Sequence, residues 1–315
     1  MRIQQNYPLK NYNTFGLNVY AQSFAEFDSV DTMEFILLNA EETKPKMILG
    51  GGSNILFTED YPGLILKNNI VFIKNVLKKE GKVLVKVGAG VNWHEFVLDC
   101  VKNNYGGIEN LSLIPGNVGA SPMQNIGAYG VEIKDVFHEL EAYDLIEKEV
   151  RKFSASDCEF GYRESVFKRK YKGRFVILNV TFALNTVPVF NTSYGAIEQQ
   201  LELMNVKELS VQAISDAVIA IRTSKLPDPE NTGNAGSFFK NPVVSTDKFQ
   251  TIKDIFYSFS NASGVQDIPF YKIGDDSIKI PAAWLIEQCG WKGYRKGDAG
   301  CYDKQALVLI NYGNA

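Results

Sequence analysis

Residues 107–130, GIENLSLIPGNVGASPMQNIGAYG, form the most informative stretch of the 315-residue chain. Glycines, prolines and asparagines recur through it, yet Leu111, Ile114 and Ile126 keep it apolar, which argues against the alternative of a disordered linker. A loop of this length is uncommon in a compact domain unless it is functional. Its backbone donors and small residues suit close contact with a large planar ligand that carries a pyrophosphate. We predict that it contacts such a cofactor.

A second glycine-rich stretch, ILGGGSN at 48–54, follows a short apolar strand predicted over 47–49. Consecutive glycines allow a tight turn that points successive backbone N–H groups into one concavity, which suits phosphate. The stretch matches neither GxGxxG nor the P-loop pattern, so a Rossmann or P-loop fold is disfavoured. An ordinary strand–loop connection is the alternative for this segment.

The segment FGYRES at 160–165 places Arg163 beside an aromatic residue on a short turn. Such an arginine can clamp a carboxylate or stabilise an enolate. The alternative is a solvated surface arginine paired with Glu164, and the segment taken alone favours that interpretation.

The segment NAGSFFKNP at 234–242 holds Ser237 between a glycine and two phenylalanines. No GxSxG elbow is present, and neither His94 nor His138 has the spacing of a base, so a hydrolase triad is disfavoured. Both histidines are interpreted as structural. A hydroxyl that donates a proton fits Ser237 better, with a core-facing serine as the alternative.

Hydrophobic periodicity divides the chain into units at 1–70, 71–225 and 226–315, the last after a proline-rich break at 226–229. Helices are predicted at 32–39, 92–103, 211–222, 247–259 and 281–289. Strands are predicted at 47–49, 64–66, 71–76, 82–87, 139–145, 175–184, 237–239 and 306–310.

Composition excludes several classes of function. Thirty-three basic against 36 acidic residues, with no basic run beyond 168–170, argue against a nucleic-acid partner. Apolar runs are far shorter than a bilayer span, and the N-terminus lacks the apolar region of a secretory signal. Four cysteines without a CxxC pair indicate free thiols in a reducing compartment and no metal site. A cytoplasmic protein is therefore expected.

Taken together, in this order, these elements resemble the UDP-N-acetylenolpyruvoylglucosamine reductase family, flavoenzymes of bacterial peptidoglycan (cell wall) synthesis. The resemblance spans nearly the whole chain and is carried by residues 13–16, 49–57, 87–93, 107–130, 160–165, 222–229, 233–242 and 305–311. The segment 193–195 resembles the tyrosine loop of the longer class of these reductases.

The resemblance implies an α+β protein with a vanillyl-alcohol-oxidase-type (PCMH-type) FAD-binding fold. Two α/β units, 1–70 and 71–225, would hold FAD, and a C-terminal α+β domain, 226–315, would cover the substrate. NADPH is the implied co-substrate, and the implied reaction reduces the enolpyruvyl ether of UDP-N-acetylglucosamine to UDP-N-acetylmuramate. FAD is expected to be non-covalent, because no histidine or cysteine stands where related flavoproteins attach it. A monomer that uses only small-molecule partners is expected.

The resemblance also assigns roles to residues. Arg163 would stabilise charge that develops on the pyruvyl carboxylate, and Ser237 would donate the proton. The implied substrate contacts are Tyr162, Tyr194, Lys225, Asn241 and Gln305. The implied cofactor contacts are Gly50, Gly51, Gly52, Ser53, Asn54, Ile114, Gly116, Gly119, Ala120, Ser121, Gly127, Ile177 and Arg222.

One departure concerns the C-terminus. The family carries a glutamate on a strand that follows one further helix after the strand at 307–310, and no acidic residue of this chain takes that place before Ala315. The resemblance therefore implies that these residues bind FAD but turn over poorly, with the end of the C-terminal domain missing. The alternatives are a non-catalytic FAD-bound nucleotide-sugar binder and a flavin oxidase that acts on a hydroxy acid or sugar. Arg163 with Ser237 disfavours the oxidase, which needs no proton donor for an enolate carbon.

Overall fold

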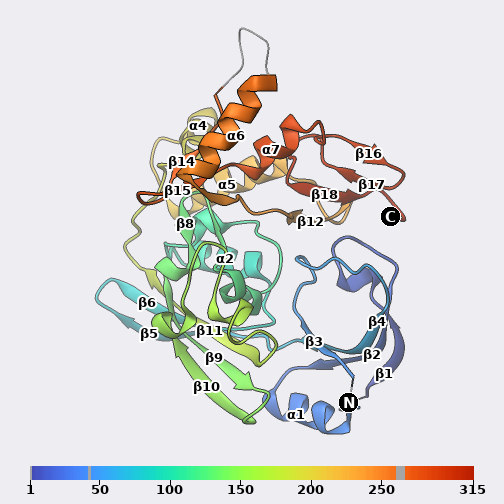
Figure 1. Cartoon of the computed structure of the whole chain (residues 1–315). Coiled ribbons are helices and arrows are strands. Elements are labelled where there is room, and N and C mark those ends of the chain that lie inside the picture. Colours follow the sequence, from blue (N-terminus) through green and yellow to red (C-terminus); the bar gives the residue numbers. More distant parts are fainter. Residues whose placement is uncertain (1, 42–43, 260–266) are drawn as a thin grey trace. The chain divides into compact units, whose positions relative to one another are not determined.

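The computed structural model describes residues 2–41, 44–259 and 267–315, which divide into two compact units between Lys225 and Leu226 (Figure 1). The first unit contains two large sheets, built from residues 4–68 and 73–185. On that basis we propose its subdivision near residue 70.

The first sheet has the strand order β1-β2-β4-β3, in which β2, β4 and β3 run parallel. Its elements are β1 Gln4–Pro8, β2 Tyr20–Phe27, β3 Lys46–Leu49 and β4 Tyr61–Asn68, with helices η1 Lys10–Tyr12 and α1 Val30–Asn39. Ser29 caps α1 by accepting the N–H of Thr32 at 3.2 Å. Buried Met33 and Ile36 of α1 pack against this sheet. The glycine-rich loop leaves β3 at the carboxyl end of the parallel strands, where open α/β sheets bind ligands.

The second sheet is antiparallel, with the order β10-β9-β11-β6-β5. Its strands are β5 Ile73–Lys79, β6 Lys82–Gly88, β9 Phe137–Asp144, β10 Glu149–Ser154 and β11 Phe175–Asn185. Helix α2, Trp93–Lys102, begins at the N-cap Asn92. Its fully buried Trp93 and Phe96 contact Phe182 of β11, with ring centroids 5.8 and 5.1 Å away. This aromatic cluster forms the centre of the largest core.

Residues 107–130, called the tract below, lie between α2 and β9, and they are folded rather than structureless. The tract contains η2 Glu109–Leu111, η3 Val118–Ala120, η4 Pro122–Gln124 and β7 Gly127–Ala128. Strand β8 Val131–Glu132, which forms a small hairpin with β7, and η5 Ile133–Asp135 follow it. Ile108, Leu111 and Val118 are fully buried in the core of the second sheet. These contacts contradict the linker alternative, because a disordered linker would not bury apolar side chains.

The remaining helices of the first unit are α3 Ala155–Cys158, η6 Val166–Lys168, α4 Gly195–Leu203 and α5 Val211–Lys225. Helices α4 and α5 pack together through Ile197, Ile214 and Val218, which are all fully buried. Helix α4 is not among the predicted helices, because its nine residues hold only a short apolar pattern.

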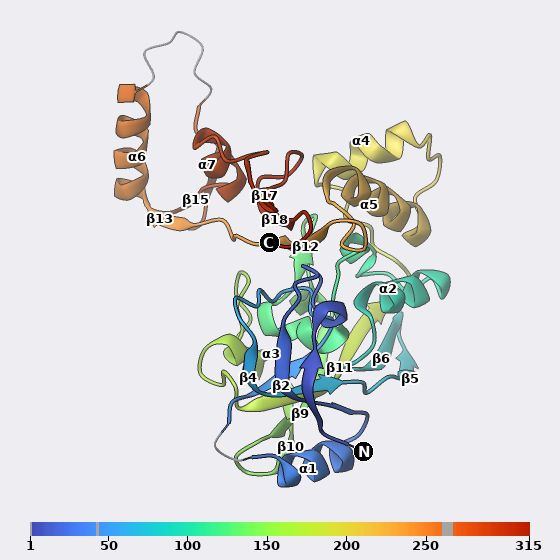
Figure 2. The same ribbon diagram turned by 90° about the vertical axis from the view of Figure 1, so that its right-hand side faces the viewer.

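The second unit contains a sheet ordered β12-β18-β17-β16 and a smaller one ordered β13-β15-β14. The elements are β12 Gly233–Ser237, β13 Val243–Ser245, α6 Thr246–Phe259, β14 Tyr271–Lys272, β15 Ser277–Lys279, α7 Ala282–Gln288, β16 Arg295–Lys296, β17 Ala299–Cys301 and β18 Val308–Asn311. Figure 2 shows α6 rising from β13, its sequence neighbour in this unit. Strand β12 lies earlier in the sequence than the strand predicted at 237–239. Its pairing with β18 shifts between Asn234 and Ser237, and within this segment Asn234 accepts the N–H of Gly236.

The described residues contain neither a membrane-spanning helix nor a metal-binding cluster. No helix among them is long and apolar enough to cross a membrane. Within the same residues, no group of three or more histidine, cysteine or acidic side chains is arranged to hold a metal ion. The four cysteines are free, and only Cys289 is exposed.

Candidate active site

The glycine-rich loop after β3 lies directly against the tract. A Cβ atom on Gly51 would lie 2.8 Å from Cα of Gly116 and 2.9 Å from Oδ1 of Asn117. A Cβ atom on Gly116, whose φ is +104°, would in turn lie 2.8 Å from Oγ of Ser53. Real Cβ atoms do not approach so closely, so glycine at both positions lets the two backbones touch.

A third segment, at 89–93, holds the tract from its other side. The N–H of Val118 donates to the Val91 carbonyl at 2.9 Å, and the N–H of Gly119 donates to the Ala89 carbonyl at 3.0 Å. The backbone N–H of Trp93 donates to the Gly116 carbonyl at 2.9 Å. Three segments far apart in the sequence therefore form one layer beside the parallel strands.

Unused donors mark the glycine-rich loop as an anion site. Across the described residues, the backbone N–H groups of residues 51–54 have no hydrogen-bond partner. Lys67, opposite Leu49 in the β3–β4 register, donates from Nζ to the Gly50 carbonyl at 2.7 Å. Burial lowers the pKa of Lys67, and the charge of Glu26 opposes this shift. A run of free N–H groups beside an ammonium suits a phosphate group.

The tract is clamped a few residues before Gly116. Leu113 has a left-handed φ of +58°, which is costly for a residue with a side chain. Its N–H donates to Nδ1 of His94 at 3.0 Å, and its carbonyl accepts from Nε of Arg222 at 3.2 Å. Burial, with the charge of Arg222 as the next cause, lowers the pKa of His94. Neutral His94 is the form that can accept this hydrogen bond.

Beyond the clamp, Arg222 also makes a side-chain hydrogen bond to Tyr129. The ring of Tyr129 meets that of Tyr194 edge-on, with centroids 5.4 Å apart. Tyr194 is exposed at the start of α4, and Lys225 is exposed at the end of α5. Both predicted substrate contacts of this region are therefore accessible.

An orphaned acceptor also lies in the tract. Nδ2 of Asn110 donates to the carbonyls of Tyr129 and Asn191, at 3.2 and 2.9 Å. Its Oδ1 atom is buried and has no hydrogen-bond partner within the described part of the chain. A buried acceptor costs free energy until a donor meets it, so a ligand donor is expected at this position.

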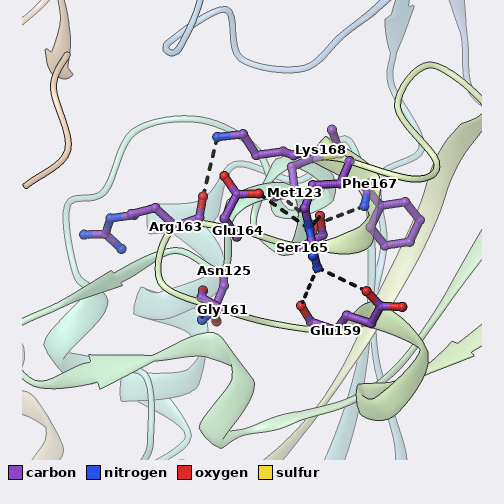
Figure 3. Close-up of polar contacts among 10 residues, drawn as sticks. Met123, Asn125, Glu159, Gly161, Arg163, Glu164, Ser165, Phe167 and Lys168 are labelled. Atoms are coloured by element: carbon purple, nitrogen blue, oxygen red, sulfur yellow. Dashed lines mark hydrogen bonds and ion pairs between the residues drawn. The ribbon is translucent and has the colours of Figure 1, made fainter. Parts of the chain in front are cut away.

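Arg163 lies on a turn that faces the tract (Figure 3). Its φ is +55°, and its Nη2 atom donates to the Gly127 carbonyl at 2.6 Å. The guanidinium lies 5.8 Å from the centre of the Tyr162 ring. Glu164, the partner that the surface alternative required, lies 3.8 Å from Nε of Arg169 in an ion pair.

The predicted residues of the second unit lie near its larger sheet. Ser237 is exposed at the end of β12 opposite Val308, so the core-facing alternative is wrong. Oδ1 of Asn241 accepts the N–H of Ala282 at 2.9 Å, which satisfies a donor at the start of α7. Oε1 of Gln305 accepts the N–H of Leu307 at 3.3 Å, just before β18.

The remaining predicted cofactor residues surround the same layer of the first unit. Ala120 ends η3, and the Ser121 hydroxyl donates to the Val118 carbonyl within the tract at 2.8 Å. Ile177 lies on β11, where its carbonyl accepts from Asn68 at the end of β4 at 3.0 Å. Sequence reasoning missed Lys67, Asn110 and the roles of Leu113 and His94, because nothing in their local pattern distinguishes them from ordinary strand, loop and helix residues.

Comparisons with known proteins agree with this geometry. A family model described as "UDP-N-acetylenolpyruvoylglucosamine reductase, C-terminal domain" matches residues 228–315, and one described as "FAD binding domain" matches residues 21–151. The chain is 46% identical to UDP-N-acetylenolpyruvoylglucosamine reductase of Flavobacterium johnsoniae, across 100% of this chain and 91% of that protein. It is 47% identical to the enzyme of the same name from Neisseria gonorrhoeae, across 98% of this chain and 87% of that one.

The chain belongs to the UDP-N-acetylenolpyruvoylglucosamine reductase family.

A solved structure supports the fold of this reductase-family chain. The crystal structure of UDP-N-acetylenolpyruvylglucosamine reductase from Thermus caldophilus superimposes with a TM-score of 0.66, at 21% identity, and covers 100% of this chain and 90% of that one. With the FAD-binding match, it confirms the predicted α+β class and the vanillyl-alcohol-oxidase-type fold. The chain is an FAD-dependent oxidoreductase of peptidoglycan synthesis.

The residues of this reductase-family chain fit FAD. The free N–H groups at 51–54 and the ammonium of Lys67 suit its pyrophosphate. The unpaired Oδ1 atom of Asn110 suits a hydrogen-bond donor such as those of a flavin or adenine ring.

The contact at Gly51 generates a first prediction. Gly51→Ala should weaken FAD binding about tenfold or more, because the new methyl group pushes the loop from Gly116 at a cost of about 1–3 kcal/mol. Fluorescence titration of the apoprotein with FAD measures the change. Gly195→Ala is the matched control, since a Cβ atom there meets nothing within 4 Å. Equal FAD affinity in the two variants would contradict the prediction.

The clamp at Leu113 generates a prediction about pH. Because the pKa of His94 is lowered in the folded chain, the unfolded chain binds more protons below its ordinary value of 6.5. Stability should therefore be complete above about pH 6.5 and decrease as the pH falls toward 5. In His94→Asn, an uncharged oxygen replaces Nδ1 as acceptor, so this decrease should become shallower.

Urea unfolding between pH 5 and 8 measures the slope. The control is His138→Asn, which replaces an exposed histidine of β9. An identical pH slope in wild type and His94→Asn would show that His94 does not carry the effect.

Proposed function

We propose that this chain uses NADPH to reduce the enolpyruvyl ether of UDP-N-acetylglucosamine to UDP-N-acetylmuramate. FAD is held non-covalently, and the protein acts in the cytoplasm as a monomer. The observation that carries the proposal is the hydrogen bond from Arg163 to the Gly127 carbonyl, because it attaches a cation to the same tract that meets the glycine-rich loop. Family membership supports the reaction, and this contact supports the role of the arginine.

The reaction adds a hydride to the terminal vinyl carbon and a proton to its neighbour, while NADPH becomes NADP⁺. Bound FAD supplies two-electron transfer between NADPH and the enolpyruvyl group. Negative charge develops on the pyruvyl carboxylate before the proton arrives. Arg163 stabilises that charge, and its commitment of Nη2 to Gly127 fixes the guanidinium before the substrate binds.

Ser237 donates the proton to the carbon beside the carboxylate. Its hydroxyl is exposed at the end of β12, and the preceding Gly236 has a left-handed φ of +66°, which sets the direction of the chain at this point. A serine has an ordinary pKa far above 7, so it transfers a proton readily only to a strongly basic centre. A carbon with enolate character is such a centre.

The substrate contacts are proposed on accessibility and on the chemistry of the side chains. Lys225 is an exposed ammonium that suits a diphosphate, and Tyr194 is an exposed ring beside Tyr129. The proposed contacts are Tyr162, Tyr194, Lys225, Asn241 and Gln305. Asn241 and Gln305 have side-chain oxygens already bonded to the backbone, so their amide nitrogens are the groups directed to the ligand.

The proposed function predicts two separable flavin half-reactions. NADPH should bleach the flavin absorbance of the purified protein, and the enolpyruvyl substrate should restore it without oxygen. Mass spectrometry should detect a product two hydrogens heavier than the substrate. Bleaching without recovery would contradict the reductase, and oxygen consumption with hydroxy acids or sugars would favour an oxidase. Acid precipitation should release the flavin.

Arg163→Lys tests the cation. Lysine keeps the charge but loses the two-pronged contact with a carboxylate. Substrate-driven recovery of flavin absorbance should slow about 10²-fold, with a smaller change in substrate affinity, because charge is greatest in the transition state. Stopped-flow spectroscopy over a range of substrate concentrations separates the two effects. A change in affinity alone would assign Arg163 to ground-state binding.

Ser237→Ala tests the proton donor. Flavin reduction by NADPH should remain nearly intact, while recovery with the enolpyruvyl substrate should slow by about 10²–10⁴. Ser258→Ala, at an exposed serine of α6 in the same unit, is the control. Equal slowing of both half-reactions in Ser237→Ala would indicate a structural serine.

A further inference from the structure

The turn that carries Arg163 is attached to the tract on both sides of the arginine. After the arginine, the buried Ser165 hydroxyl donates to the Met123 carbonyl at 2.7 Å (Figure 3). Arg163 itself donates to Gly127 at 2.6 Å. The side that precedes the arginine begins at Gly161, which forms an isolated bridge with Glu164 that closes the turn.

Asn125 holds the Gly161 side. It is fully buried with a left-handed φ of +44°, and its Nδ2 atom donates to the Gly161 carbonyl at 3.1 Å and to Oε2 of Glu132 at 3.0 Å. Its Oδ1 atom accepts the N–H of Lys134 at 3.1 Å. Both amide hydrogens and the oxygen are therefore used, which fixes the orientation of the carboxamide.

We propose that Asn125 is a positioning residue for Arg163: its carboxamide fixes where the Arg163 turn lies relative to the tract at 107–130. This inference rests on the proposed function, because it assigns Asn125 an effect on the step in which Arg163 takes part. Asn125 acts through the Gly161 carbonyl and touches neither reacting group.

The backbone of the turn explains why such a support is needed. Arg163 has a left-handed φ of +55°, a conformation that persists in a residue with a side chain only when its surroundings determine it. Without the bond to Asn125, the Gly161 side of the turn is released, and the position of the guanidinium then depends on its own bond to Gly127 and on the Ser165 side of the turn. A displacement of about 1 Å can cost about 10²-fold in rate.

The test removes the carboxamide without straining the backbone. Asn125→Gly suits the left-handed φ of this position and deletes both donors. Asn125→Asp is the second variant, since it keeps the shape and the acceptor for Lys134 but cannot donate to Gly161. Asn104→Gly is the matched control, because Asn104 has a φ of +55° and is exposed after α2.

Both Asn125 variants should retain FAD and be reduced by NADPH at the wild-type rate. Substrate-driven recovery of flavin absorbance should slow about 10- to 10²-fold. In an Arg163→Lys background, Asn125→Gly should cause little further slowing, because the group that it positions is already altered. Asn104→Gly should behave as wild type in every assay.

Three outcomes would overturn the proposal. The first is loss of FAD or failure to fold in both variants, and the second is equal slowing of both half-reactions. The third is a double variant, Asn125→Gly with Arg163→Lys, whose rate falls by the product of the two single effects. Each would show that Asn125 supports the tract in general rather than the arginine. Failure of the proposed function itself is distinguishable, because the wild-type protein would then give no substrate-driven recovery at all.

Discussion

The close approach of the loop at 50–54 to residues 116–119 is the constraint on which the rest of the first unit depends. Two backbones can touch at this distance only where side chains are absent, and Gly51 and Gly116 meet that condition. The contact lies beside the loop whose N–H groups are free, at the carboxyl end of the parallel strands. Bound phosphate would satisfy those donors, so cofactor binding would stabilise the folded loop.

Three cations around this layer bond to backbone carbonyls. Lys67 donates to Gly50, Arg222 to Leu113 and Arg163 to Gly127. A carbonyl orients a cation without neutralising it, so the positive charge stays available to an anionic ligand. Elsewhere in the same unit, cations face carboxylates: Arg174 makes a two-pronged contact with buried Asp144, and the side chain of Lys86 meets Glu141. These contacts with carboxylates join neighbouring parts of the second sheet.

Three left-handed residues belong to the same region. Leu113, Asn125 and Arg163 all have left-handed backbone conformations, at φ of +58°, +44° and +55°. Each makes a hydrogen bond with a different element. Leu113 donates to His94 on α2, Asn125 accepts from Lys134 on η5, and Arg163 donates to Gly127 on β7. Strained residues persist where the surroundings determine them, which is common where ligands must be met in a fixed geometry.

Sequence alone determined the class of the protein and the segments that matter. Local patterns are visible in the chain: the apolar periodicity of α2 and α5, the alternation in β6, and the unusual composition of residues 107–130 follow from short-range physics. Local segments singled out Arg163 and Ser237 as candidates, and the resemblance to a family assigned their roles in one reaction.

Tertiary structure decided how the segments meet. Lys67 resembles any strand lysine until β4 pairs with β3 and brings its ammonium to the Gly50 carbonyl. Asn125 resembles any turn asparagine until the chain folds back and places Gly161, 36 positions later, beside it. Helix α4 is too weakly patterned to be predicted and is stabilised by packing on α5. These features depend on contacts between distant residues, and the free energy of such contacts exists only once the whole unit has folded.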